Sequence, residues 1–323
     1  MGKHAYIAIE PVRLKISSDR PSCLSGVKTE LNNHANGRPP ILLSIAGFDP
    51  SCGAGVAADI KTFAAHNCYG VAAVTALTVQ SSSGVTAVHS TSAPILRAQL
   101  EALAEDLPIA AVKIGMLGTK ANAVAVAEFL DKYKFVHVIL DPVTKSTAGN
   151  AELIDAAGLK FLRDEFLRRA SVITPNIPEA ELLTGMEVKD VAGMKLAAQK
   201  LIEQGARAVV VTGGHLERPT DVLCDQGEIF ILDGESVKNT NTHGSGCTFS
   251  SAIAAQLASG QELRDAVILA KVYVARAIDK AYAIGKGPGP LNHLFRFHQD
   301  PPPRGVHEVP QHGMHPASEP ATH

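Results

Sequence analysis

The amino-acid sequence predicts an α/β protein with a central, mostly parallel β-sheet that carries helices on both faces. Short apolar runs alternate with longer amphipathic segments across residues 41–297, as in chains built from βαβ units. Polar or glycine-rich turns follow several of these runs, and that edge of a parallel sheet is where ligands bind. We expect one ordered domain over residues 41–297, with disordered tails at 1–40 and 298–323.

The elements can be assigned in order from these patterns. The expected strands are 41–46, 71–79, 110–114, 136–140, 171–174 and 208–212, followed by a hairpin of 221–224 with 229–232. The expected helices are 54–66, 94–107, 121–132, 151–169, 179–184, 190–204, 249–259 and 263–283.

The composition excludes several classes of function. A net charge of -2 gives no general attraction to nucleic acid or to anionic membranes, and 5% aromatic residues without Trp argue against base stacking. Five cysteines without CxxC spacing fit a reducing cytosol better than a disulfide framework or a structural zinc site. The apolar run 70–79 is too short to cross a bilayer, and residues 1–40 lack the apolar core of a signal peptide. We therefore expect a cytoplasmic protein that acts on a small molecule.

A glycine-containing stretch over residues 239–248 precedes the predicted helix 249–259. Glycines before a helix expose backbone N–H groups in one concavity, where the helix dipole also favours an anion such as phosphate. Cys247 is expected in the first helical turn, where the pKa of a thiol tends to fall. The competing interpretation is a loop that uses Gly244 and Gly246 only to turn, since Gly-x-Gly alone is common.

Polar residues at strand ends are further candidates. The Gln80 amide can both donate to and accept from a planar heterocycle, although a plain strand-end residue explains it equally well. Asp141 also ends a strand. Asn176 and Glu179 could meet across a turn and hold hydrated Mg²⁺, or form a capping pair of the following helix.

Other features have simpler explanations. The turn 47–55 lacks the complete Gly-x-Gly-x-x-Gly pattern and its later acidic residue, so we reject dinucleotide binding. Asp59 and Lys271 would, on their own, be read as solvated surface charges, and the tail histidines as solvated too.

Several of these stretches together resemble one family. They are Ala46-Gly47 with Asp49-Pro50, Gly53-Ala54-Gly55 with Ala58-Asp59-Ile60-Lys61-Thr62, Thr75–Gln80, Lys113–Leu117, Thr174-Pro175-Asn176 with Pro178-Glu179, Gly213-Gly214-His215 and Asn241–Thr248. In this order they are similar to the hydroxymethylpyrimidine/phosphomethylpyrimidine kinases of thiamine biosynthesis, in the ribokinase-like superfamily. The resemblance covers about residues 41–297 and implies a three-layer α/β/α fold and a homodimer.

The resemblance also implies roles for individual residues. The anion hole for the transferring phosphoryl group corresponds to Gly244, Ser245, Gly246 and Cys247. Cys247 stands where sugar kinases of the superfamily carry an aspartate base, and it could act as a base or only position and polarise the acceptor. The pyrimidine pocket corresponds to Gln80, Asp59, Met116, Val143 and Gly47. The ATP side corresponds to Asn176, Thr212, Gly213, Thr242 and Lys271, and the magnesium motif to Glu179 and Asp141.

Four positions depart from the family pattern. Cys52 replaces a usual glycine and Ser245 a usual threonine, and both replacements are small enough to preserve the loops. Thr212 stands where lysine is common, and the flap lysine aligns nearer Thr147 than Lys145. We expect these last two differences to alter ATP affinity or flap closure.

The resemblance implies an ATP- and Mg²⁺-dependent kinase. Its expected substrates are 4-amino-5-hydroxymethyl-2-methylpyrimidine and then the resulting monophosphate. Pyridoxal or pyridoxine kinase is the near alternative, because that ring also carries a hydroxymethyl group. A sugar kinase fits less well, since Cys247 replaces the aspartate. A non-catalytic pyrimidine-binding regulator is the alternative from a different class.

Overall fold

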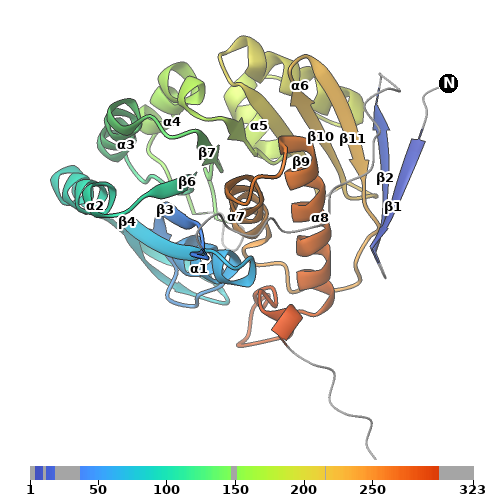
Figure 1. Cartoon of the computed structure of the whole chain (residues 1–323), viewed down its shortest axis with the longest axis horizontal. Helices are drawn as coiled ribbons and strands as arrows, with labels where there is room; N and C mark the ends of the chain where they lie inside the picture. The colour runs from blue at the N-terminus through green and yellow to red at the C-terminus, as the bar shows by residue number, and fades with distance from the viewer. Residues whose placement is uncertain (1–3, 10–11, 19–36, 147–150, 215, 298–323) are drawn as a thin grey trace, which may run out of the picture.

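A single eleven-stranded sheet runs through the computed structural model, which describes residues 4–9, 12–18, 37–146, 151–214 and 216–297 (Figure 1). The strand order is β1-β2-β11-β10-β9-β8-β7-β6-β3-β4-β5. Its central run is parallel, and it comprises β9 (Ala208–Gly213), β8 (Val172–Ile173), β7 (His137–Leu140), β6 (Ile109–Ile114), β3 (Ile41–Phe48) and β4 (Tyr69–Ser81). This confirms the predicted mostly parallel sheet.

Antiparallel strands extend the sheet at both ends. At one end β5 (Gly84–Ser90) pairs with β4. At the other end lie β10 (Thr220–Asp225), β11 (Glu228–Asp233), β2 (Val12–Ser18) and β1 (His4–Ile9). The β10–β11 pair is the predicted hairpin. Strands β1 and β2 belong to the segment 1–40; the rest of that segment up to residue 36, and residues 298–323, lie outside the described residues, so the predicted tails stay predictions.

Helices cover both faces of the sheet, which makes the architecture three-layered (Figure 1). One face carries α1 (Gly55–Ala65), α7 (Ser245–Ala258) and α8 (Leu263–Asp279). The other carries α2 (Ala93–Asp106), α3 (Lys120–Tyr133), α4 (Ala156–Phe161), α5 (Ile177–Thr184) and α6 (Val191–Glu203). Each face buries its own apolar core. Among the described residues, no helix is both long and apolar enough to span a bilayer.

The structure corrects the predicted helix over 151–169. The Asp155 carboxylate accepts a hydrogen bond from the Gly158 amide, so α4 begins only at Ala156. A π-helical turn follows it at Leu162–Phe166, and a 3₁₀-helical turn follows that at Leu167–Arg169. Strand β5 was not predicted, because Ser81, Ser82 and Ser83 suggest a loop rather than a hairpin.

Helix α7 begins at Ser245, earlier than the predicted residue 249. Gly244 lies just before it with φ of +83°, a conformation that glycine adopts without strain. Gly246 and Cys247 therefore lie in the first turn of the helix, as the sequence predicted for Cys247. Helix α8 ends at Asp279 rather than near residue 283.

Candidate functional site

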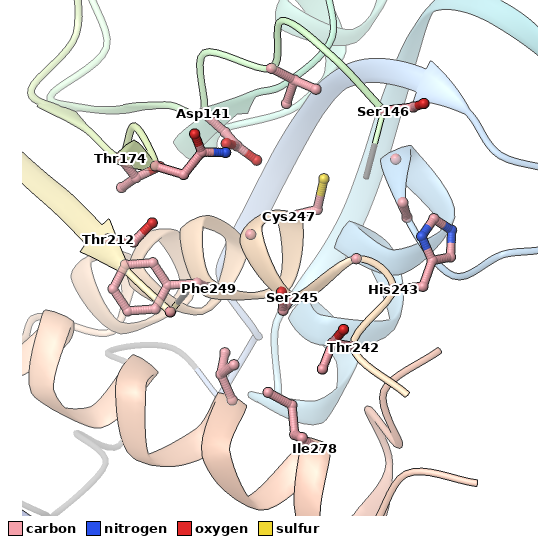
Figure 2. Close-up of a pocket in the computed structure, with 18 of the residues that line it drawn as sticks. Asp141, Ser146, Thr174, Thr212, Thr242, His243, Ser245, Cys247, Phe249 and Ile278 are labelled. Atoms are coloured by element: carbon pink, nitrogen blue, oxygen red, sulfur yellow. The ribbon is translucent and has the colours of Figure 1, made fainter. Parts of the chain in front are cut away.

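A cavity of about 490 Å³ lies at the carboxyl ends of the parallel strands, beside the start of α7. Most of the predicted site residues line it, namely Gly47, Gln80, Met116, Asp141, Val143, Asn176, Glu179, Thr212, Thr242, Gly244, Ser245, Gly246, Cys247 and Lys271. Two predicted residues, Asp59 and Gly213, do not line it. Figure 2 shows Cys247 and Asp141 facing the same space above α7, with Thr242 and His243 on the preceding loop.

The loop before α7 is held by backbone contact between glycines. A Cβ added to Gly244 would overlap the carbonyl oxygen of Gly53, and one added to Gly55 would overlap that of Gly47. The Ser245 amide donates to the carbonyl of Thr242 at 3.1 Å. A helix leaves its first N–H groups without partners inside the helix, and Gly246 at this turn has open space around its Cα. The turn is therefore suited to an anion.

Burial raises the pKa of the Cys247 thiol to about 12. Lys113 opposes this rise, while the nearby carboxyl groups of Asp141 and Asp59 add to it. The expectation of a lowered thiol pKa is therefore wrong for this arrangement, because burial and two carboxyl groups outweigh the opposing effects of Lys113 and of a backbone hydrogen bond from Gly55. At neutral pH the Cys247 side chain is a neutral thiol that can donate a hydrogen bond.

This high pKa predicts slow alkylation of Cys247. The thiolate is the reacting form, so iodoacetamide at pH 8 should label Cys247 at least about ten times more slowly than half-buried Cys52 in the same molecule. Peptide mapping by mass spectrometry over time would measure both rates. Labelling of Cys247 ahead of Cys52 would contradict the raised pKa.

Two buried carboxyl groups, Asp141 and Glu179, face the cavity together. Burial raises the pKa of Asp141, and it raises that of Glu179 to about 8 with a further contribution from Asp141. A divalent cation would relieve the repulsion between the two carboxylates, so both residues fit a magnesium site. Among the described residues no cluster of three or more His, Cys, Asp or Glu side chains could hold a metal. Mg²⁺ commonly takes one or two carboxylates and completes its shell with water and phosphate oxygens.

Lys113 lies behind these carboxyl groups and is completely buried. Its ammonium nitrogen is 2.9 Å from Asp59 Oδ1 and 3.8 Å from Asp141 Oδ2. Burial would lower the pKa of Lys113, yet the nearby acidic groups outweigh burial and raise it. The carboxylate of Asp59 also accepts hydrogen bonds from Ser44 at 2.6 Å and Ser251 at 2.7 Å.

These contacts correct the interpretation of Asp59. The isolated motif suggested a surface carboxylate, but the side chain is fully buried. The family resemblance implied a contact with the pyrimidine, which stays a prediction; Asp59 does not line the cavity, and its carboxylate joins β3, β6 and α7. Its partners explain this position, because Lys113, Ser44 and Ser251 all bond to its carboxylate.

Asn176 and Glu179 form a capping box at the start of α5. The Glu179 amide donates to Asn176 Oδ1 at 2.9 Å, and the Asn176 amide donates to Glu179 Oε2 at 2.9 Å. The capping interpretation is thus confirmed. It does not exclude a ligand role, because both residues also line the cavity.

At the far end of the cavity Thr212 pairs with Asp221 across β9 and β10. Lys271 reaches from α8 to this point, where its ammonium nitrogen is 2.6 Å from Asp221 Oδ2. It is therefore a buried, paired lysine rather than a solvated one. The Gly213 amide donates to Asp221 Oδ1 at 3.1 Å, so Gly213 is part of the sheet and does not line the cavity. Lys145 is exposed and lines the cavity, whereas Thr147 lies outside the described residues.

The opposite end of the cavity contains Gln80, Met116, Val143 and Gly47. A Cβ added to Gly47 would come within 2.9 Å of Met116 Sδ, so glycine keeps this end open. Nearby Cys52 has φ of +58°, a left-handed conformation that suits the glycine usual in the family.

Sequence reasoning gave no separate role to Asp49, His243 or Lys113. His243 Nε2 lies 2.9 Å from Asp49 Oδ2, a contact between distant parts of the chain that no local pattern reveals. Lys113 had one available signal, since a charged residue within an apolar strand needs a buried partner. Periodicity could not separate the apolar side chains of α8 that line the cavity from core residues; they are Val272, Val274, Ala275 and Ile278.

Comparisons with known proteins show the family to which the chain belongs. A family model described as phosphomethylpyrimidine kinase matches residues 49–292. A hydroxymethylpyrimidine/phosphomethylpyrimidine kinase of Haemophilus influenzae is 41% identical over 242 residues, which are 73% of this chain and 90% of that protein. A thiamine biosynthesis bifunctional protein of Geobacter sulfurreducens is 40% identical over 240 residues. That match covers 74% of this chain but only 49% of the relative, so the chain spans about half the length of that bifunctional protein.

Solved structures of two kinds of kinase resemble this chain. Phosphomethylpyrimidine kinase from Clostridium difficile has a TM-score of 0.66 and 38% identity, over 74% of this chain and 99% of that one. An ADP complex of Bacillus subtilis pyridoxal kinase has a TM-score of 0.75 and 36% identity, over 80% of this chain and 100% of that one.

Proposed function

This chain belongs to the phosphomethylpyrimidine kinase family, and we propose that it transfers the γ-phosphoryl group of ATP to 4-amino-5-hydroxymethyl-2-methylpyrimidine and then to its monophosphate. One observation carries this proposal. The first turn of α7, which is suited to an anion, lines the cavity. Gln80 lies at one end of this cavity, and Thr212 and Lys271 lie at the other. An acceptor ring and a nucleotide could therefore meet at Gly246 and Cys247.

The acceptor end supports an aminopyrimidine. The Gln80 amide offers one donor group and one acceptor group, and an aminopyrimidine edge presents the complementary pair. Met116 and Val143 provide apolar surface for the ring, and Gly47 leaves room for it. We assign these four residues to the acceptor.

Phosphoryl transfer depends mainly on positioning and on stabilising negative charge. We assign the amides of Gly246 and Cys247, with the loop residues Gly244 and Ser245, to the transferring group. Because the free thiol of Cys247 is neutral at pH 7, it supports hydrogen bonding to the acceptor oxygen rather than a ready-made base. Asp141 and Glu179 would hold Mg²⁺, whose positive charge offsets the negative charge of the phosphates.

The nucleotide end supports ATP. We assign Asn176, Thr212, Thr242 and Lys271 to this side, because all four line the cavity. A lysine is usual in the family at position 212, and Lys271 brings an ammonium group to Asp221, the residue paired with Thr212. We propose that the Lys271–Asp221 ion pair borders the nucleotide here in place of a free lysine.

Pyridoxal kinase is the second candidate, because solved pyridoxal kinases share this fold at 36% and 32% identity. A pyrimidine-binding regulator without catalysis would bind the ring but release no ADP. The predicted cytoplasmic location and homodimer stay predictions.

A coupled assay of ADP release with Mg-ATP tests the proposal. We expect turnover with the hydroxymethylpyrimidine and with its monophosphate. Gln80→Ala should lower kcat/KM for the pyrimidine by about 10- to 100-fold, because the amide pairs with its edge. Gln199→Ala, the same change at an exposed position on α6, serves as control and should leave kcat/KM unchanged.

Two outcomes would contradict this function. Turnover only with pyridoxal would establish the second candidate. Pyrimidine binding without acceptor-dependent ADP release would establish the regulator.

A further inference from the structure

Four polar groups form a chain at the acceptor end of the cavity. His243 Nε2 lies 2.9 Å from Asp49 Oδ2 and 3.2 Å from Gln80 Nε2. Gln80 Oε1 is 3.1 Å from the hydroxyl oxygen of Thr78, which itself lies 3.0 Å from the Phe48 carbonyl oxygen. Which atoms carry the protons in this chain determines what Gln80 can offer a ligand.

The proton on His243 can be located from Asp49. The Asp49 carboxylate accepts from the amides of Gly53 at 3.1 Å and Ala54 at 2.9 Å, both through Oδ2. An ionised carboxylate only accepts hydrogen bonds, so His243 Nε2 must carry a proton to bond with it. His243 Nδ1 is buried without a hydrogen-bond partner, so a proton there would be unsatisfied. Of the two tautomers, the one with its proton on Nε2 is favoured.

This tautomer determines the orientation of Gln80. A protonated Nε2 has no lone pair with which to accept from Gln80 Nε2, so a hydrogen bond forms only with the carboxamide turned over, its oxygen sharing the Nε2 proton with Asp49. The two ends of a carboxamide have the same shape, and hydrogen bonding decides which atom is which.

Thr78 can bond to either end of the carboxamide. Its one hydroxyl proton can go to the Phe48 carbonyl oxygen at 3.0 Å or to Gln80 Oε1 at 3.1 Å. With the carboxamide turned over, that proton goes to Phe48 and the hydroxyl oxygen accepts from the Gln80 nitrogen. Thr78 therefore accommodates the order that the His243 tautomer requires.

We propose that His243, held by Asp49, is a positioning residue that fixes the order of donor and acceptor on Gln80 and thereby selects the acceptor ring. This inference rests on the proposed function. An aminopyrimidine presents an amino donor beside a ring nitrogen acceptor, and a fixed carboxamide pairs with that edge in one sense only. Turning the ring over would reverse the order and leave both hydrogen bonds unmade. His243 therefore determines which way the hydroxymethyl group points.

The position of His243 links ring selection to the anion-binding turn. His243 directly precedes Gly244, and a Cβ added to Gly53 would overlap the imidazole ring. The ring is thus packed against the glycine loop that also touches Gly244.

Nitrogen NMR of the full-length protein tests the tautomer without any substrate. With ¹⁵N-labelled histidine at pH 7, we expect His243 to show a protonated Nε2 and an unprotonated Nδ1. The His243→Gln variant identifies the His243 signals among those of the other histidines. A proton on Nδ1 alone would overturn the inference, whether or not the protein proves to be a kinase.

Calorimetric binding tests the selection. His243→Leu removes the Nε2 donor and Thr78→Val removes the acceptor for the carboxamide nitrogen. Each should weaken binding of the hydroxymethylpyrimidine by about tenfold while changing pyridoxal binding less. His243→Gln, whose amide nitrogen can take the place of Nε2, should restore most of the affinity.

The two matched changes separate positioning from a purely structural role. Thr78→Ser keeps the hydroxyl and should bind like the unmodified protein. Equal losses for both ligands, or no rescue by His243→Gln, would overturn the inference. If the unmodified protein binds no pyrimidine, the proposed function fails and ring selection fails with it, while the NMR result still decides the proton arrangement.

Discussion

Gly244→Ala is expected to remove most of the kinase activity and to destabilise the fold. At φ of +83° an alanine is strained by about 1–2 kcal/mol, and its Cβ would also overlap the carbonyl of Gly53. We expect the free energy of unfolding to fall by about 2–4 kcal/mol. Separation of the two loops would displace the first turn of α7, so kcat/KM should fall at least about 100-fold.

Gly246→Ala provides a matched control two residues away. Nothing lies within 4 Å of a Cβ added there, and the position is helical. Its stability should change by less than about 1 kcal/mol, because alanine is also the better helix former. Activity should still fall, since the methyl group occupies space that we assign to the transferring phosphoryl group. Chemical denaturation and steady-state kinetics measure both variants, and equal losses of stability would contradict the close contact at Gly244.

Lys113→Met is expected to lower the free energy of unfolding more than the removal of any other single charged side chain. Removal of the ammonium group leaves the Asp59 and Asp141 carboxyl groups buried without their cation. Breaking a buried pair from one side costs about 3–5 kcal/mol. Urea denaturation at pH 7 would measure this loss.

An exposed lysine and a double variant give the controls. Lys132 lies 3.4 Å from Glu101 with both side chains more than half exposed, so Lys132→Met should lower the free energy of unfolding far less than Lys113→Met does. Combining Lys113→Met with Asp59→Asn should recover part of the stability, because one unpaired charge is removed. If Lys113→Met costs no more than Lys132→Met, Lys113 does not compensate the buried carboxylates.

The central part of the fold was predictable because parallel strands are buried on both faces. The apolar runs that became β3, β4, β6, β7 and β9 are short and clearly bounded. Strand β5 is half exposed and follows a run of serines, so neither its composition nor its turn identified it. The cap at Asp155 was missed because a single acidic residue also occurs within helices.

Site residues could be predicted where their position alone, at the end of a strand or the start of a helix, marks them as candidates. Gln80, Asp141 and Gly246 follow strands or start a helix, and these places are visible in the sequence. Asp59 and Cys247 were misjudged because their chemistry depends on neighbours from other strands. Lys113 determines the surroundings of both, and its distance from them could not be obtained from spacing.

The contact between Gly53 and Gly244 makes the first turn of α7 depend on two distant parts of the chain. One glycine follows β3 and the other precedes α7, so nearly the whole sheet lies between them along the chain. A fragment that lacks β3 and α1 would retain every amide of the turn but not the wall against which Gly244 rests. Phosphate binding by two separately expressed fragments would accordingly report their correct reassembly, and either fragment alone should bind none.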